Sequence, residues 1–181
     1  MTDIDQILKE AGETTVYNLQ RLDKTVTTAE SCTGGMIAST MVGVSGASGV
    51  LWGSFVTYMP EAKHCMIHVS NTTMNKYGLV SKETAKEMVL GALKCSGTDY
   101  AISVTGLAGS ADNMKYVNPV NESDMKDPDN GKPIGLVYIA CASLYEKKII
   151  IRKYLFRGSR NRIRKKAAVK ALQMLNDEFL L

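Results

Sequence analysis

The chain has 181 residues, of which 45% are hydrophobic and 22% charged, which suits one globular domain and argues against a disordered, collagen-like or coiled-coil protein. Its net charge of +4 is uneven, because the segment Lys147–Lys170 holds 11 of the 22 basic residues and no acidic one, which leaves the remainder at −7. Such a basic block requires either an anionic partner or a solvated helix face.

Targeting and metal-binding signals are missing from the sequence. No run reaches the roughly 18 apolar residues that a membrane span needs, and the acidic N-terminus lacks the features of a secretory signal, so we expect a cytoplasmic protein. The four cysteines form no CxxC pair, which is typical of reduced thiols. His64 and His68 are four residues apart but lack a third ligand, so we expect no metal site.

The first part of the chain alternates between helical and strand patterns. Apolar residues recur at helical spacing, and short β-branched or apolar runs predict strands. The expected elements are a helix over 3–22, a strand over 25–29, a helix over 36–42, a strand over 50–58, a helix from Pro60, a helix from its N-cap Ser81 to about Cys95, and a strand over 100–104.

The composition changes after these elements. Residues 110–133 hold three of the four prolines and five acids, so we expect a long surface loop. Strands over 134–143 and 149–156 predict an antiparallel hairpin, and Ser159 begins a closing amphipathic helix. This order predicts a three-layer α/β/α sandwich with a mixed central sheet, formed as a single domain by residues 1–181.

The sequence AESCTGG at 29–35 joins the first expected strand to the next helix. Its glycines allow a sharp turn, and the following helix directs free N–H groups toward that turn. Ser31 can therefore cap the helix, line a phosphate site, or act as a nucleophile beside oxyanion-stabilising amides. A serine nucleophile also needs a base to accept its proton. The motif alone leaves these three interpretations open.

Tyr58 and Lys63 flank the start of the expected third helix. Tyr58 ends a strand and Lys63 lies about one turn into the helix, so both can reach the sheet edge that carries Ser31. A partly buried lysine can lose its proton and act as a base, and a Ser/Lys pair assisted by Tyr suits amide hydrolysis. The alternative is a solvated lysine on a helix surface.

Two further segments can approach an anionic ligand. Thr105 and Gly106 end a buried strand, where the backbone can come close to a ligand at the carboxyl edge of a sheet. Four arginines between Arg157 and Arg164 surround the start of the last helix, where arginine opposes the helix dipole but suits a phosphate. The alternatives are a nucleic-acid surface and a solvated helix face, and sparse aromatic residues argue against single-strand binding.

Five motifs in this order resemble the CinA C-terminal domain family over about residues 5–178. They are TTAESCTGG (27–35), EAK (61–63) after Tyr58, GLVSKETAKEM (78–88), VTGLAG (104–109) and FRGSRNRIRKKA (156–167). The resemblance implies an α/β/α domain, usually a homodimer, that hydrolyses the carboxamide of nicotinamide mononucleotide to nicotinate mononucleotide and ammonia. It implies no metal and no organic cofactor.

The resemblance also implies roles for individual residues. Ser31 would be the nucleophile, Lys63 its general base and Tyr58 an assisting hydroxyl. The implied substrate-binding residues, with the two arginines toward the phosphate, are Thr33, Gly34, Gly35, Thr105, Gly106, Arg160 and Arg164.

Two segments depart from the family pattern. Met59-Pro60 replaces the usual residues before EAK, and Ser110–Asn113 with a longer acidic insertion replaces a Gly-Pro-Gly-Gly stretch. The larger N-terminal domain of many relatives is missing, so we expect a stand-alone form. Besides the amidohydrolase, two functions stay open: a non-catalytic nucleotide-binding module of this family, and a nucleic-acid-binding protein that uses the basic block.

Overall fold

A mixed five-stranded sheet forms the centre of the computed structural model, which describes residues 3–109, 129 and 131–181. In sheet order the strands are β2 (Leu51–Val56), β1 (Val26–Glu30), β3 (Tyr100–Gly106), β4 (Leu136–Ser143) and β5 (Lys148–Leu155). β1 pairs in parallel with both β2 and β3, whereas β4 pairs antiparallel with β3 and β5. The carboxyl ends of three neighbouring strands therefore lie at one edge of the sheet.

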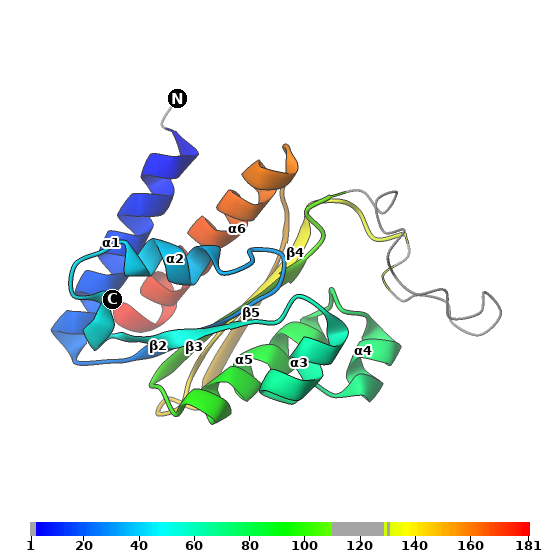
Figure 1. Cartoon of the computed structure of the whole chain (residues 1–181), viewed down its shortest axis with the longest axis horizontal. Coiled ribbons are helices and arrows are strands. Elements are labelled where there is room, and N and C mark those ends of the chain that lie inside the picture. Colours follow the sequence, from blue (N-terminus) through cyan, green and yellow to red (C-terminus); the bar gives the residue numbers. More distant parts are fainter. Residues whose placement is uncertain (1–2, 110–128, 130) are drawn as a thin grey trace.

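Helices cover both faces of this sheet (Figure 1). One face carries α1 (Ile4–Leu22), α2 (Met36–Val42) and α6 (Arg160–Leu175). The other carries α3 (Pro60–Ile67), α4 (Asn71–Tyr77) and α5 (Lys82–Ser96). A short 3₁₀ helix spans Ala47–Gly49, and a π-helical turn spans Asn176–Leu180. The three-layer α/β/α class with a mixed sheet is confirmed.

The two faces of the sheet carry side chains of different size. Branched residues such as Ile102 and Ile139 pack toward α1 and α6. The fully buried strand positions toward α5 are small: Ala29, Ala101, Ser103, Ala140 and Ala142. Small side chains let a helix approach closely, and Ser103 Oγ donates a hydrogen bond of 2.7 Å to the carbonyl oxygen of Ala85 on α5.

Both predicted serine caps are confirmed. Ser81 Oγ accepts a hydrogen bond from the backbone N–H of Thr84 at 3.1 Å, and Ser159 Oγ accepts one from Arg162 at 3.4 Å. Each bond satisfies an N–H group that the first turn of a helix leaves without a partner.

Several details differ from the sequence predictions. The helix α4, which has seven residues and no side-chain cap, is not among the predicted elements. β2 ends at Val56 rather than Tyr58. β4 begins at Leu136 rather than Ile134, because the φ of Gly135, +92°, lies outside the range of a β-strand. The predicted surface loop over 110–133 lies largely outside the described residues.

No described helix has the combination of length and apolar character that crossing a bilayer requires.

Helix α3 meets α5 at Gly91, where the contact leaves no space for a side chain. A Cβ at Gly91 would lie 1.9 Å from the carbonyl oxygen of Ile67, the last residue of α3. Because α3 also carries Lys63, this glycine helps to fix the position of the helix that supplies the lysine.

Replacing Gly91 by alanine should destabilise the fold, although alanine is intrinsically the better helix former by about 1 kcal/mol. We expect the free energy of unfolding to fall by about 2–3 kcal/mol, because the methyl group forces α3 away from α5. Urea unfolding followed by circular dichroism measures this change. Gly49→Ala, where no atom lies within 4 Å of the added Cβ, is the control; equal stability of the two variants would contradict the prediction.

Candidate active site

Ser31 lies at the carboxyl edge of the three parallel strands. Glu30, the last residue of β1, is in register with Val56 on β2 and Val104 on β3. The backbone N–H of Ser31 then donates to the carbonyl of Val104 at 3.0 Å, and Thr57 N–H donates to the carbonyl of Glu30 at 2.8 Å. The serine is thus held between the ends of both neighbouring strands, where α/β folds place their ligands.

Two glycines turn the chain sharply after Ser31. Gly34 and Gly35 have φ angles of 61° and 86°, a left-handed conformation that residues with a Cβ rarely adopt. The N–H of Gly34 closes the turn by donating to the carbonyl of Ser31 at 3.1 Å. α2 begins directly afterwards, at Met36.

The side chain of Lys63 reaches Ser31 from the opposite layer of the fold. Its Nζ lies 3.0 Å from Ser31 Oγ, 2.6 Å from the carbonyl oxygen of Thr57 and 3.2 Å from that of Tyr58. Lys63 is only 1% exposed, so the alternative of a solvated surface lysine is wrong.

Burial changes the protonation chemistry of this lysine. Loss of solvent lowers the pKa of Lys63 from 10.5 to about 8, and the negative charge of Asp129 opposes this shift only in part. A neutral amine has two N–H groups and one lone pair. The carbonyls of Thr57 and Tyr58 can accept both N–H groups, which leaves the lone pair for the hydroxyl proton of Ser31. The arrangement suits a serine nucleophile with a lysine base.

The neighbouring Cys32 is a poor candidate for the nucleophile. Its side chain is buried, and burial raises the pKa of the thiol to about 12. Because the thiolate is the reactive form of cysteine, this thiol stays unreactive at neutral pH.

Glu30 holds α2 against the end of β1. Its carboxylate is fully buried and accepts hydrogen bonds from the backbone N–H groups of Ile37 at 3.1 Å and Ala38 at 3.0 Å. These are amides of the first turn of α2, so the protein itself satisfies donors that a phosphate site would use. The sequence analysis does not identify this role, although an acid between a buried strand and a helix is a usable signal.

The side chain of Tyr58 contacts Arg160 rather than the Ser31–Lys63 pair. It is 55% exposed, and its hydroxyl accepts a hydrogen bond of 3.1 Å from Arg160 Nη2. Arg160 also lies close to Gly109, where a Cβ would be 2.7 Å from its Nη1. Tyr58 contacts Lys63 through its backbone carbonyl, and the role of its hydroxyl stays a prediction.

Arg164 binds the serine turn itself. Its Nε donates to the carbonyl of Cys32 at 3.0 Å, and its Nη2 donates to the carbonyl of Thr33 at 2.8 Å. Thr33 is fully buried, and its Oγ1 has no hydrogen-bond partner within the described part of the chain. The structure therefore brings Arg164 and Thr33 to the site, with the arginine facing protein carbonyls.

Thr105 and Gly106 are engaged within the fold. Thr105 Oγ1 donates to the carbonyl of Leu79 at 2.6 Å. Gly106 pairs with Val137 on β4, and a Cβ on the glycine would lie 2.7 Å from Val137 Cγ2. Close packing of the sheet thus accounts for the glycine, and contact of either residue with a ligand stays a prediction.

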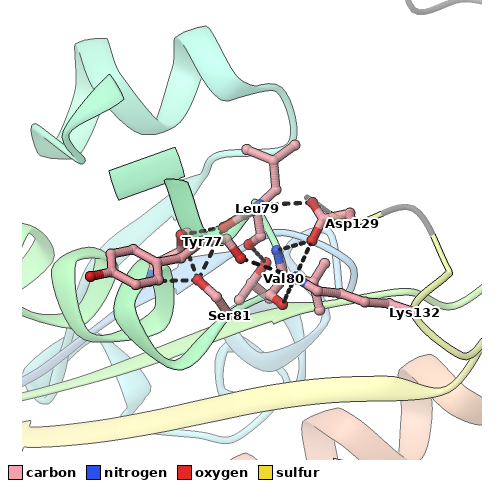
Figure 2. A network of polar contacts seen from close by, with 9 residues as sticks. Tyr77, Leu79, Val80, Ser81, Asp129 and Lys132 are labelled. Atoms are coloured by element: carbon pink, nitrogen blue, oxygen red, sulfur yellow. Dashed lines mark hydrogen bonds and ion pairs between the residues drawn. The ribbon is translucent and has the colours of Figure 1, made fainter. Parts of the chain in front are cut away.

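The described end of the insertion docks on the loop before α5 (Figure 2). The carboxylate of Asp129 accepts from the backbone N–H groups of Leu79 at 2.7 Å and Val80 at 3.1 Å. Lys132 Nζ lies 2.6 Å from Asp129 Oδ1 and donates to the carbonyls of Tyr77 and Val80. Sequence analysis does not find this contact, because nothing local links residue 129 to residue 79.

Most of the basic block is committed to contacts within the protein. Lys165 pairs with Asp5, and both Lys148 and Arg152 pair with Glu178. Further hydrogen bonds to protein acceptors are made by Arg160, Arg164, Lys166 and Lys170. These contacts favour a structural explanation of the block over a nucleic-acid surface. Within residues 3–109, 129 and 131–181, no three metal-ligating side chains are grouped to hold an ion.

Replacing Lys63 by methionine should change how stability depends on pH. Because the pKa of Lys63 is lower in the folded state, the unfolded chain binds the proton more strongly between about pH 8 and 10.5. The wild type should therefore gain about 2 kcal/mol of stability relative to the variant from pH 8 to pH 10. Urea unfolding at both pH values measures the difference in unfolding free energy between the wild type and the variant. Lys82→Met, at an exposed lysine of α5, is the control. A stability difference between wild type and Lys63→Met that is the same at both pH values would refute the prediction.

The sequence matches relatives with two kinds of name over nearly its whole length. The nicotinamide-nucleotide amidohydrolase PncC of Escherichia coli K12 is 38% identical over 183 residues, covering 99% of this chain and 98% of that protein. A CinA-like protein of Endomicrobium trichonymphae is 39% identical over 98% of this chain. The chain spans 37% of the length of that relative, and 33–38% of the length of others like it.

Solved structures share the fold. The competence/damage inducible protein CihA from Agrobacterium tumefaciens matches with a TM-score of 0.81 and 32% identity, covering 94% of both chains. The competence damage-inducible protein A from Klebsiella pneumoniae matches with a TM-score of 0.80 and 27% identity, covering 94% of this chain and 96% of its own. A family model for the CinA C-terminal domain matches residues 8–120 and 123–179. The chain therefore belongs to the CinA C-terminal domain family.

Proposed function

We propose that the protein is an amidohydrolase that converts nicotinamide mononucleotide to nicotinate mononucleotide and ammonia. The observation that carries this proposal is the 3.0 Å contact between Ser31 Oγ and the buried Nζ of Lys63. A relative of the same length named nicotinamide-nucleotide amidohydrolase supports the substrate.

In the first half of the proposed reaction, Ser31 attacks the carboxamide carbon while neutral Lys63 takes the hydroxyl proton. The carbonyl oxygen becomes an oxyanion, for which backbone N–H groups of the serine turn are the proposed donors. When the C–N bond breaks, the Lys63 ammonium returns the proton to the leaving nitrogen. Ammonia departs, and an ester links Ser31 to the substrate.

In the second half, water replaces ammonia. Lys63 is neutral again and takes a proton from the water that attacks the ester carbon. Collapse of the second tetrahedral intermediate breaks the bond to Ser31 Oγ, which recovers its proton from Lys63. The products are the regenerated Ser31 hydroxyl and a pyridine carboxylic acid, which loses its proton to solvent. One lysine thus serves as base and acid in both halves.

The exposed guanidinium of Arg160 is the proposed contact for the substrate phosphate. It lies beside Tyr58 and Gly109, at the edge of the Ser31 site, and guanidinium binds phosphate with two parallel hydrogen bonds. We further propose that Tyr58 contacts the bound nucleotide, that the protein is a homodimer and that it acts in the cytoplasm.

Substitution of the two central residues should remove activity without unfolding the protein. We expect Ser31→Ala and Lys63→Met to lower kcat for ammonia release from nicotinamide mononucleotide by about 10³-fold or more, because each removes an essential part of one unit. Cys32→Ala is the control and should keep most activity. If wild-type protein binds the nucleotide, seen as a rise in melting temperature, but releases no ammonia, the protein is a non-catalytic binding module instead.

The rate should follow the protonation of Lys63. Only the neutral amine can take the Ser31 proton, and its pKa is lowered to about 8 by burial. We therefore expect kcat/KM to rise with pH through an apparent pKa near 8 and then to level off. Initial rates from pH 6.5 to 9.5 give this profile; a rate that is constant over this range would exclude Lys63 as the base.

A further inference from the structure

Two arginines one turn apart on α6 make different contacts. Arg160 is exposed and reaches the hydroxyl of Tyr58. Arg164 is partly buried and binds the carbonyls of Cys32 and Thr33, the two residues that follow Ser31. Both arginines fit the sequence signal for a phosphate site, yet only Arg160 faces outward.

The contacts of Arg164 determine how two peptide groups of the turn are oriented. In a planar trans peptide the carbonyl and the next N–H point in opposite directions. A guanidinium bound to the carbonyl of Cys32 therefore directs the N–H of Thr33 away from α6. The bond to the carbonyl of Thr33 likewise orients the N–H of Gly34, which donates to the carbonyl of Ser31 at 3.1 Å.

Little else in the described residues holds these carbonyls. The carbonyl of Thr33 accepts one long bond of 3.4 Å from Met36 N–H, and that of Cys32 has Arg164 as its partner. Gly34 lies against this guanidinium, since a Cβ there would be 3.4 Å from Arg164 Nη2. A guanidinium suits this task, since its rigid fork can reach two acceptors at once.

We propose that Arg164 is a positioning residue for the reaction at Ser31: it fixes the turn that carries the serine hydroxyl, while Arg160 is the arginine that meets the phosphate. This inference rests on the proposed amidohydrolase function. It replaces the phosphate role that the sequence predicts for Arg164.

A substrate pair separates the two roles. Nicotinamide mononucleotide and nicotinamide riboside carry the same carboxamide, but only the first has a phosphate. We expect Arg164→Met to lower kcat about 100-fold on both substrates with little change in KM, because a shifted turn misplaces the Ser31 hydroxyl. Arg164→Lys keeps the charge but not the forked guanidinium, and its kcat should be about 10-fold lower on both substrates. Arg160→Met should raise KM for the mononucleotide and leave the riboside unaffected.

The opposite pattern would overturn the proposal. If Arg164→Met or Arg164→Lys weakens only the mononucleotide reaction, Arg164 is a phosphate ligand, and if both variants keep wild-type rates on both substrates, the turn does not depend on it. Lys165→Met, which removes the neighbouring ion pair with Asp5 on the same helix, is the matched control and should behave as wild type.

A second measurement keeps this test separate from the substrate assignment. If the wild type releases no ammonia from either compound, the proposed function fails. The rate at which a fluorophosphonate labels Ser31, followed by mass spectrometry, then tests the turn directly in folded wild type and Arg164→Lys. Slower labelling of the variant supports the positioning role, and equal labelling overturns it.

Discussion

The site depends on one unfavourable arrangement, an amine buried beside a serine hydroxyl. An ammonium in the protein interior requires compensation, and among the described residues no carboxylate forms an ion pair with Lys63. Its partners are the Ser31 hydroxyl and two backbone carbonyls. Carbonyls accept the N–H groups without stabilising the charge as strongly as a carboxylate does. The lysine is therefore held in place and remains able to release its proton.

The serine turn is the point where both helical layers meet across the sheet edge. Lys63 arrives from α3 on one side, while Glu30 fixes α2 and Arg164 reaches in from α6 on the other. The close packing of α5 on small strand residues brings the α3 layer near enough for a lysine side chain to span the gap. The chemistry thus requires the whole sandwich, although only a few atoms take part in it.

Sequence reasoning finds the parts of this site that are local and misses those that are not. The turn is predictable because consecutive glycines follow a strand, and the approach of Lys63 is predictable because a strand end and a helix start share one sheet edge. The role of Arg164 is not predictable, since a basic cluster is also typical of an anion site, and an acid at a strand end gives only a weak signal for the role of Glu30. The helix α4 is also missed, because seven residues carry too little periodicity.

The anchoring of Asp129 and Lys132 has a consequence for how this family can diversify. The strand before the insertion ends at Gly106 and is tied to the loop before α5 through Thr105, and the insertion's far end is bound to that same loop. Thr105 and Asp129, on either side of residues 110–128, are thus both held by one loop. We therefore expect changes of length or sequence between them to leave the serine turn and Lys63 in place.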